Sequence, residues 1–443
     1  MNLSTLRRTR TLLLVCLGAA CLAGAQRATA ANYKLQVVTD RENALYEVGE
    51  TAKFLVTVTD GGEEVTDGSV SYIVDDYVTD HAADAFPRGS LKLNGKPQAV
   101  SVSLKKSGFL RCRVTFIGPD KKRLQATAGA GFSPLKIPLS LPVPDDFDAF
   151  WAAQKAELAK LPLDPKLTDV KSPNADIACF DVQVQCTGGA PVSGYFGKPT
   201  DAKPKSLPAI LWVHGAGVRG SALGNAITGA KAGMLSMDIN AHGIPNGKPG
   251  KFYQQLSAGK LKNYRYAGRE KRETSYFRGM YLRIVRAIDF LTAQPEWDGK
   301  TVIVIGHSQG GGQSLVAGGI DSRVTMIAPG VPAICDHSGR AADRINGWPK
   351  LVPNGENGKP DAAILQASRY VDAVNFASRC KADAIMSVGF IDGVCPPSSC
   401  YAAYNALQGK KTVINKPLMG HAAPADIKDA FFARILEHIK QNK

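Results

Sequence analysis

Apolar and polar residues alternate along the first part of the chain with the two-residue period of β-strands. Turn sequences such as Asp60-Gly61-Gly62 and Asn94-Gly95 separate the alternating stretches. The pattern predicts six strands, at residues 34–38, 52–58, 69–73, 98–104, 110–117 and 124–128. Short strands at this density are typical of an immunoglobulin-like β-sandwich, which we assign to residues 31–135. We expect it to act as a spacer or dimerisation domain, with carbohydrate binding as the alternative.

The pattern changes after a proline-rich segment at 134–144. Beyond it, stretches with helical spacing of apolar residues alternate with short apolar runs. Helices are expected at 145–161, 275–293 and 427–440, and strands at 207–214, 233–239, 301–305, 324–328, 384–389 and 412–417. Such alternation predicts a mostly parallel sheet covered on both faces. Residues 136–443 are therefore assigned to one α/β domain.

The apolar strand at 301–305 ends in Gly306-His307-Ser308-Gln309-Gly310, and small and polar residues then begin a helix. An α/β-hydrolase presents its nucleophile in this way, on a tight turn between a buried strand and a helix. The serine takes a strained conformation there, and the flanking glycines relieve crowding where strand and helix nearly touch. The sequence thus indicates Ser308 as a nucleophile. The alternative is a serine in a glycine-rich loop that only binds a ligand.

A serine nucleophile needs a base that accepts its proton and a carboxylate that orients the base. In α/β-hydrolases the acid and then the histidine follow the serine along the chain. His421 lies in the loop after the last predicted strand, and Asp392 ends the strand before it. These are the candidate base and acid, with a plain turn residue as the alternative for Asp392. His337 comes too early to leave room for an acid, and we expect a surface role for His438 in the C-terminal helix.

The tetrahedral intermediate of such a reaction needs two N–H donors for its oxygen. One is expected from the backbone of Gln309, directly after the nucleophile. The other is expected from the loop after an earlier strand, where small residues follow in His214-Gly215-Ala216-Gly217. We assign Ala216 as the second donor and expect a structural hydrogen bond from His214.

Further sequence blocks accompany the serine turn. They are Phe147-Asp148-Ala149-Phe150-Trp151, Tyr276-Phe277-Arg278-Gly279-Met280-Tyr281, Ala373-Val374-Asn375-Phe376-Ala377 and Cys395-Pro396-Pro397-Ser398. With them, the chain from about residue 144 onward resembles the acetyl xylan esterase/cephalosporin C deacetylase family, carbohydrate esterase family 7. The resemblance implies Ser308, Asp392 and His421 as the triad, deacetylation of sugars, often xylo-oligosaccharides, and no metal cofactor.

The chain also departs from that family's pattern. Asn240-Ala241-His242-Gly243 stands where the family usually has Arg-Gly-Gln, and Gly420-His421-Ala422 replaces Gly-His-Glu. Ala216 takes the place of a tyrosine that often helps to form the oxyanion hole. The triad is retained while the substrate loops are reshaped. His242 is thus a candidate either for substrate contact or for a structural role.

Residues 1–30 have the pattern of an export signal, with Arg7, Arg8 and Arg10 before a short apolar core and small-residue cleavage sequences after it. The core is too short to span a bilayer as a stable helix. We therefore expect a secreted or periplasmic protein without stable membrane insertion. The signal contains two of the nine cysteines, so an odd number remains, among which Cys179–Cys186 and Cys395–Cys400 are candidate disulfides.

Composition adds limits to this interpretation. A chain of 443 residues with 44% hydrophobic and 21% charged residues is an ordinary globular protein of two domains. Much of the net charge of +15 lies in residues 260–286. We expect a solvated basic surface there, with attraction to an acidic polysaccharide as the alternative. The sequence contains no nucleic-acid-binding module and no cysteine or histidine spacing typical of zinc sites.

The sequence therefore predicts an exported serine esterase that removes acetyl groups from poly- or oligosaccharides, without a cofactor or metal. A homo-oligomer is compatible with this prediction. An α/β-hydrolase peptidase or a general carboxylesterase is the alternative enzyme, although such peptidases usually carry a larger N-terminal propeller. A carbohydrate-binding protein with a vestigial hydrolase domain is the non-enzyme alternative, and the presence of all three triad residues argues against it.

Overall fold

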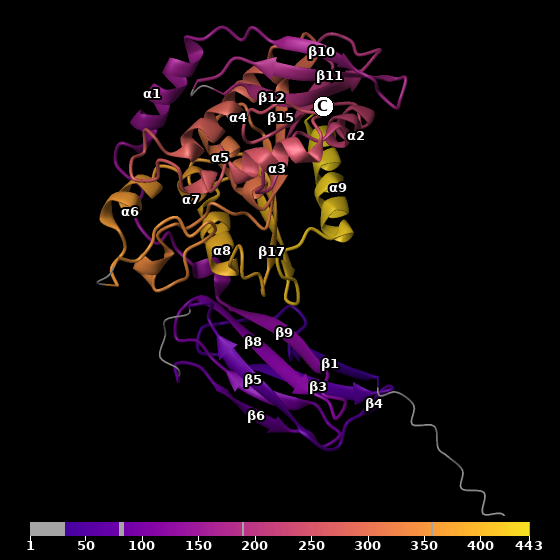
Figure 1. Ribbon diagram of the computed structural model, residues 1–443, viewed down its shortest axis with the longest axis vertical. Helices are drawn as coiled ribbons and strands as arrows, with labels where there is room; N and C mark the ends of the chain where they lie inside the picture. Colours follow the sequence, from indigo (N-terminus) through magenta and orange to yellow (C-terminus); the bar gives the residue numbers. More distant parts are fainter. Residues whose placement is uncertain (1–31, 79–83, 188–189, 356–357, 443) are drawn as a thin grey trace, which may run out of the picture.

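A computed structural model describes residues 32–78, 84–187, 190–355 and 358–442. A smaller all-β part formed by the N-terminal residues lies against one end of a larger α/β part (Figure 1). The predicted export signal falls outside the described residues. Within them, no helix combines the length and the apolar composition needed to cross a membrane.

The all-β part contains two sheets around one hydrophobic cluster. In one sheet β1, β3 and β4 follow one another and β7 pairs with β3, and the other has the order β2-β9-β8-β5-β6. Buried residues alternate with exposed ones, as along β3, where Phe54 and Val56 point inward. The strands are β1 (Tyr33–Thr39), β2 (Leu45–Tyr46), β3 (Ala52–Asp60), β4 (Glu63–Glu64), β5 (Ser69–Asp75), β6 (Arg88–Lys92), β7 (Gln98–Val102), β8 (Gly108–Ile117) and β9 (Arg123–Phe132). The immunoglobulin-like topology of this part stays a prediction.

The α/β part is built on a nine-stranded sheet with the order β10-β11-β12-β14-β13-β15-β16-β17-β18. The strands from β14 to β18 in this order are parallel, whereas β10, β11 and β12 run antiparallel to their neighbours. Their bounds are β10 (Lys166–Val170), β11 (Ile177–Val184), β12 (Val192–Pro199), β13 (Leu207–Val213), β14 (Leu235–Ile239), β15 (Trp297–His307), β16 (Met326–Gly330), β17 (Asp383–Gly389) and β18 (Lys411–Lys416). The predicted, mostly parallel sheet is therefore confirmed.

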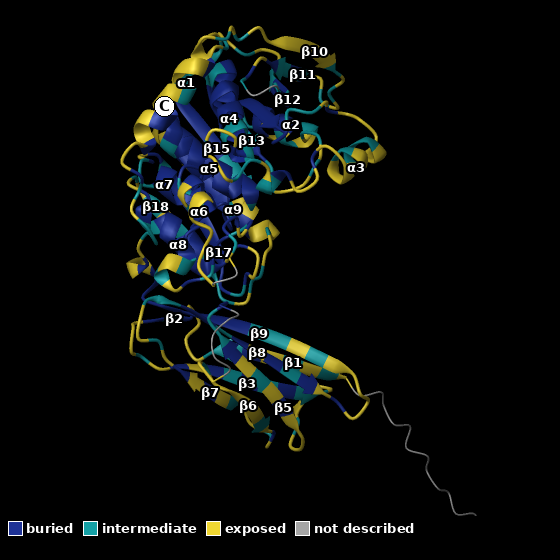
Figure 2. Ribbon diagram, turned by 60° about the vertical axis from the view of Figure 1, so that its left-hand side comes forward, coloured by how far each residue is buried: buried dark blue, intermediate teal, exposed yellow. Residues whose placement is uncertain are grey.

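Helices cover both faces of this sheet because successive strand residues point to opposite sides. Ile210 and Ile303 pack in one cluster with α9, while Leu211 and Val304 belong to the cluster that holds α4 and α5. Figure 2 shows α4 and α5 buried along most of their length. The helices are α1 (Phe147–Ala159), α2 (Leu223–Lys231), α3 (Gly250–Ala258), α4 (Tyr276–Thr292), α5 (Gln309–Ile320), α6 (Ala362–Ser368), α7 (Ala373–Ala377), α8 (Pro397–Ala406) and α9 (Ala425–Gln441), with short 3-10 helices at Pro134–Lys136, Tyr264–Tyr266 and Gly339–Ala342.

The basic segment 260–286 is not wholly the solvated surface that the sequence led us to expect, because two of its arginines on α4 are buried. Arg283 and Arg286 are buried, at 4% and 3% exposure. Arg283 donates to the carbonyl of Ala241 (2.7 Å), and Arg286 donates to the carbonyls of Leu158 and Leu161. Both guanidinium groups therefore join α4 to neighbouring segments, because a buried charge needs polar partners.

His438 is also buried, so the expected surface role is wrong. Its Nδ1 lies 3.2 Å from an Asp383 carboxylate oxygen and its Nε2 lies 3.1 Å from the Thr325 hydroxyl. The ring thus connects α9 to the starts of β16 and β17. The seven cysteines of the described residues are all free and buried, so neither candidate disulfide forms.

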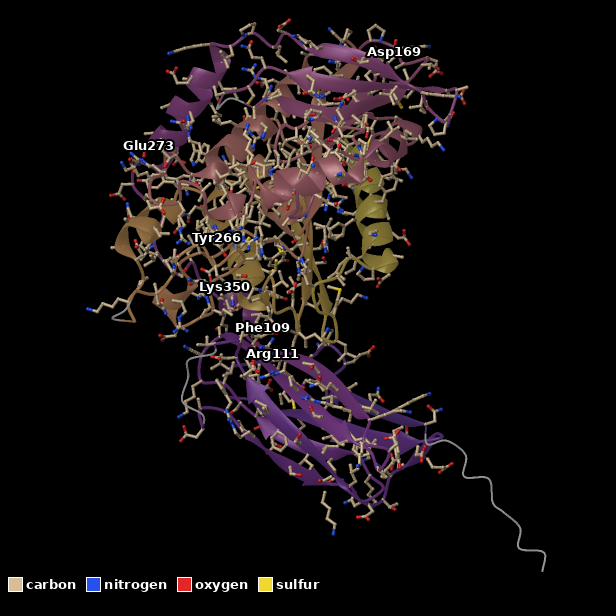
Figure 3. All side chains as sticks on the ribbon, viewed as in Figure 1. Phe109, Arg111, Asp169, Tyr266, Glu273 and Lys350 are labelled. Atoms are coloured by element: carbon tan, nitrogen blue, oxygen red, sulfur yellow. The ribbon has the colours of Figure 1, made fainter. Side chains whose placement is uncertain are left out.

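The two parts of the molecule share a packed junction. Ala44, Tyr77 and Phe109 of the all-β part belong to the main hydrophobic cluster of the α/β part. The Asn405 side chain donates to the carbonyls of Pro134 and Ile137, both at 2.9 Å. Figure 3 shows Phe109 at the end of the β-sandwich that faces the α/β part. The all-β part and the α/β part are therefore joined by packed side chains as well as by the chain itself.

We expect the two parts to unfold together because they share this cluster. All four tryptophans lie in the α/β part, so their fluorescence reports on that part alone. Calorimetry should give a single endotherm whose calorimetric and van't Hoff enthalpies agree, with the fluorescence change at the same temperature. A separate endotherm without a fluorescence change would show that the β-sandwich unfolds independently.

Candidate active site

Ser308 stands on a tight turn between β15 and α5. Its backbone has φ 59° and ψ −120°, outside the regions that L residues ordinarily occupy. The Ser308 N–H donates to the carbonyl of Gly330 on β16 at 2.9 Å, which fixes the turn against the next strand. This is the strained turn that the Gly-x-Ser-x-Gly sequence predicts.

The glycines of the motif let three backbone segments meet beneath the serine. A Cβ atom on Gly310 would lie 2.1 Å from the carbonyl oxygen of Val213, at the end of β13. One on Gly306 would lie 2.4 Å from the carbonyl oxygen of Gly310. Neither contact is sterically tolerable, so any side chain at either position would push β13, β15 and α5 apart.

The structure brings the three predicted triad residues together in one hydrogen-bonded series. His421 Nε2 lies 2.9 Å from Ser308 Oγ, and His421 Nδ1 lies 2.8 Å from an Asp392 carboxylate oxygen. Because a carboxylate only accepts, Nδ1 carries the proton and Nε2 is free to accept the serine proton. The residues follow β15, β17 and β18, whose carboxyl ends lie at the same edge of the sheet, where ligands bind in such folds.

Asp392 is fully buried, and its second carboxylate oxygen accepts the backbone N–H groups of Val394 (2.8 Å) and Cys395 (2.9 Å). Two backbone hydrogen bonds tie the loop that carries Asp392 (the acid loop) to the loop that carries His421 (the base loop). The Phe390 N–H donates to the Lys416 carbonyl at 3.0 Å, and the Ile391 N–H donates to the Met419 carbonyl at 3.2 Å. The carboxylate therefore has one orientation, directed at the His421 ring.

The loop predicted to supply an oxyanion donor lies beside the serine. A Cβ atom on Gly215 would stand 3.5 Å from Ser308 Cβ. Ala216 is the next residue of the chain, so it lies close to the nucleophile in space. Gln309 is the first residue of α5, and N–H groups in a first helical turn have no acceptor within the helix. The assignment of Gln309 and Ala216 as oxyanion donors stays a prediction.

Two neutral histidines hold this loop in place. His214 Nδ1 donates to the Gly215 carbonyl at 2.6 Å and its Nε2 accepts the Ala241 N–H at 3.1 Å. His242 Nε2 donates to the Gly217 carbonyl at 3.0 Å. Burial lowers the pKa of His214 to about 3 and that of His242 to about 4, so both rings are neutral near pH 7. The structural hydrogen bond expected of His214 is therefore present. His242 also makes structural hydrogen bonds, and its contact with substrate stays a prediction.

Two tyrosines next to these residues were not predicted from the sequence. The Tyr276 hydroxyl lies 2.7 Å from His242 Nδ1, and the Tyr264 hydroxyl donates to the Gln309 side-chain oxygen at 2.6 Å. Tyr264 lies in a short 3-10 helix within an irregular segment. Its sequence carries no periodic pattern that would place it beside the nucleophile.

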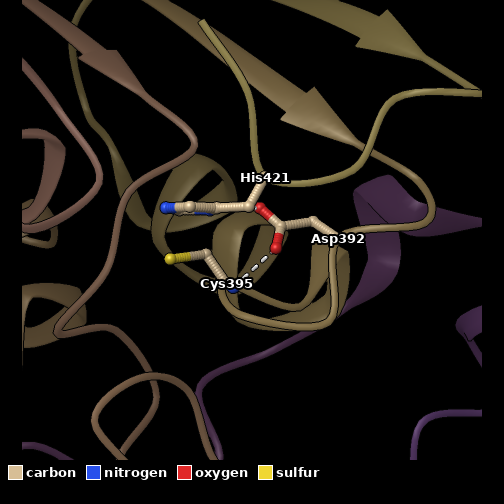
Figure 4. A group of neighbouring side chains, drawn as sticks. All are labelled: Asp392, Cys395 and His421. Carbon is tan, nitrogen blue, oxygen red and sulfur yellow. Dashed lines mark hydrogen bonds and ion pairs between the residues drawn. The ribbon is translucent and has the colours of Figure 1, made fainter.

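One group of side chains at the site has ligand types that can hold a metal. Atoms of Asp392, Cys395 and His421 lie within 4.8 Å of one another (Figure 4). However, the Asp392 carboxylate already accepts three hydrogen bonds. Burial raises the pKa of the Cys395 thiol well above its ordinary value, whereas metal ligation requires a thiolate. The donor set therefore fits a hydrogen-bonded triad better than a metal centre.

Comparison with known proteins shows the family of the chain. Residues 139–437 match the acetyl xylan esterase (AXE1) family. The acetyl esterase Axe7A of Xylanibacter ruminicola is 31% identical over 395 residues, which cover 88% of this chain and 87% of that protein. This match is longer than the α/β part, so it extends into the β-sandwich.

Solved structures are similar over a shorter stretch. An acetyl xylan esterase from Paenibacillus sp. R4 is 27% identical with a TM-score of 0.59, and the match covers 69% of this chain and 98% of that one. Acetyl xylan esterase 1 from Thermoanaerobacterium sp. JW/SL YS485, at 23% identity, shares the fold with a TM-score of 0.58 over 69% of this chain and 97% of its own. The chain thus belongs to the acetyl xylan esterase family, has an α/β-hydrolase fold in its larger part, and is a carboxylic ester hydrolase.

Proposed function

We propose that this chain is an exported serine esterase that removes acetyl groups from poly- or oligosaccharides through an acyl-enzyme intermediate. The observation that carries the proposal is the hydrogen-bonded series from Asp392 through His421 to Ser308 on a strained turn. The names of its relatives support an acetylated carbohydrate as substrate. The pattern of residues 1–30 supports export, and an immunoglobulin-like sandwich completes the proposed domain organisation.

In the first half of the reaction, Ser308 Oγ attacks the acetyl carbonyl carbon and its proton passes to His421 Nε2. The carbonyl oxygen becomes negative and accepts hydrogen bonds from the N–H groups of Gln309 and Ala216. As the intermediate collapses, the bond to the sugar oxygen breaks, and that oxygen takes the proton from His421. The sugar leaves with a free hydroxyl, and the acetyl group remains on Ser308.

In the second half, a water molecule attacks the acetyl-serine carbonyl carbon while His421 Nε2 accepts one of its protons. The bond between Ser308 Oγ and the acetyl carbon then breaks, and Oγ recovers the proton from His421. The second proton of the water stays on the product, so acetic acid is released and ionises to acetate in solution, and the enzyme returns to its starting state. Asp392 keeps its carboxylate beside Nδ1 throughout, so the imidazolium formed in each half is stabilised and correctly oriented.

Triad variants test this mechanism. We expect Ser308→Ala to lower kcat for nitrophenyl acetate by roughly 10⁶-fold. His421→Ala should lower kcat almost as much, because triad members act as a unit, and Asp392→Asn should lower it about 10⁴-fold. The melting temperature of Ser308→Ala should stay close to that of the wild type. Ser322→Ala is the matched control, because this exposed serine lies between α5 and β16, at the amino edge of the sheet. Wild-type turnover by Ser308→Ala would refute the proposal.

The acyl preference tests the deacetylase assignment against a general carboxylesterase. A cavity of about 560 Å³, lined by apolar residues such as Trp212, Ile305 and Phe431, lies beside His307 and Gly215. If this cavity held the acyl chain of the substrate, each methylene buried in it would make binding about 0.8 kcal/mol more favourable. We expect the opposite, a fall in kcat/KM from nitrophenyl acetate through butyrate to octanoate, because the described residues after the Ser308 turn include no long apolar lid. A steady rise with chain length would favour the general carboxylesterase.

A further inference from the structure

One edge of the β-sandwich lies directly against the loops that carry Asp392 and His421. The Gly129 N–H on β9 donates at 3.0 Å to the carbonyl of Pro417, just after β18 and four residues before His421. The Phe109 ring on β8 packs edge-on against the Phe390 ring, with centroids 5.0 Å apart. Figure 3 shows Phe109 and Arg111 at this junction. The β-sandwich therefore contacts both loops of the triad.

Tyr77 makes the most direct of these contacts. Its hydroxyl donates a hydrogen bond to the backbone carbonyl of Phe390, two residues before Asp392. Tyr77 is 3% exposed, and burial raises the pKa of its hydroxyl well above the ordinary value, so the group keeps the proton that it donates. A buried carbonyl without this donor would lose a hydrogen bond that water cannot replace.

Tyr77 is itself held in place by two neighbours. Its backbone N–H donates to an Asp75 carboxylate oxygen at 3.0 Å, and Arg111 Nε donates to the same oxygen at 2.7 Å. The Arg111 guanidinium carbon lies 4.2 Å from the centre of the Tyr77 ring. The ring is therefore fixed between an ion pair and the acid loop, and its hydroxyl has one direction.

The β-sandwich reaches both sides of Asp392. A Cβ atom on Gly129 would lie 2.4 Å from the Phe390 carbonyl oxygen, so the β9 backbone rests directly on this residue. Arg111 pairs with Gly129 across the two strands. Its Nη1 lies 3.5 Å from the place where a Gly393 Cβ would stand. Residues 390 and 393, which flank the acid, thus lie beside neighbouring positions of one sheet.

From these contacts we propose that the β-sandwich positions the acid and base of the triad, with Tyr77 and Gly129 as positioning residues. The inference rests on the proposed function, since it takes Asp392 and His421 as acid and base. Movement of Phe390 changes the direction of the Asp392 carboxylate, and the hydrogen bond from Phe390 to Lys416 passes the change to the base loop. Neither residue touches the substrate; both act through Asp392 and His421.

Full-length Tyr77→Phe and Gly129→Ala variants test this role. Tyr77→Phe removes the hydroxyl that holds the Phe390 carbonyl, and Gly129→Ala pushes a methyl group against it. We expect kcat for nitrophenyl acetate to fall about tenfold in the first and about a hundredfold in the second, because small misplacements of catalytic groups have large effects. KM should stay within about twofold of the wild type, since substrate contacts are unchanged.

The chain offers a matched control for each variant. Tyr46 is another buried tyrosine beneath an arginine, but its hydroxyl bonds to Asp40 within the β-sandwich. Gly108 lies on β8, where an added Cβ would meet Leu104 at an ordinary 3.5 Å. Tyr46→Phe and Gly108→Ala should therefore keep the wild-type kcat, even where their melting temperatures fall as far as those of the test variants.

A double-mutant cycle separates positioning from a general loss of folding. In an Asp392→Asn background, Tyr77→Phe should lower kcat much less than it does in the wild type, because the Asp392 carboxylate, one of the two groups through which it acts, is gone. An equal loss of kcat in both backgrounds would overturn the inference, and so would equal kcat values for Tyr77→Phe and Tyr46→Phe. In either case an inactive Ser308→Ala variant would still support the proposed function. An active Ser308→Ala would instead remove the proposed function, and the inference with it.

Discussion

The close approach of three backbone segments beneath Ser308 is the constraint on which the rest of the site depends. Glycines at 306 and 310 allow β13, β15 and α5 to meet at separations that no side chain permits. The serine is thereby placed at the tip of a strained turn, and α5 begins at the next residue, Gln309. The loop after β13 necessarily begins beside the nucleophile, where His214 and His242 hold it in one conformation.

The acid and base depend on a second set of constraints that lies partly outside the hydrolase sheet. Asp392 and His421 stand on loops after the neighbouring strands β17 and β18, and backbone hydrogen bonds tie these loops together. Their outer side rests on β8 and β9 of the β-sandwich. The part of the chain that we expect from the sequence to be a spacer thus lies beside the residues that flank the acid. This placement gives the junction a bearing on catalysis as well as on stability.

Features of the fold and the site that depend on local sequence patterns could be predicted from the sequence. The serine turn follows from glycines within two residues of Ser308, and the order of acid and base along the chain places Asp392 and His421. Burial of Arg286 and His438 could not be predicted, since their partners, Leu158 and Asp383, come from distant segments. Strand β6 escaped prediction because an exposed edge strand lacks alternation. The contact of Tyr77 with Phe390 spans 313 positions and leaves no local signal.

The central claim is that Ser308 carries the acyl group between the two halves of the reaction. Rapid mixing of the enzyme with nitrophenyl acetate, quenched in acid and followed by mass spectrometry of its peptides, tests this claim most directly. We expect a burst of one nitrophenol per active site and an acetyl group on the peptide that contains Ser308. Turnover without any acetylated peptide, or acetylation of another residue such as Cys395 in its place, would contradict it.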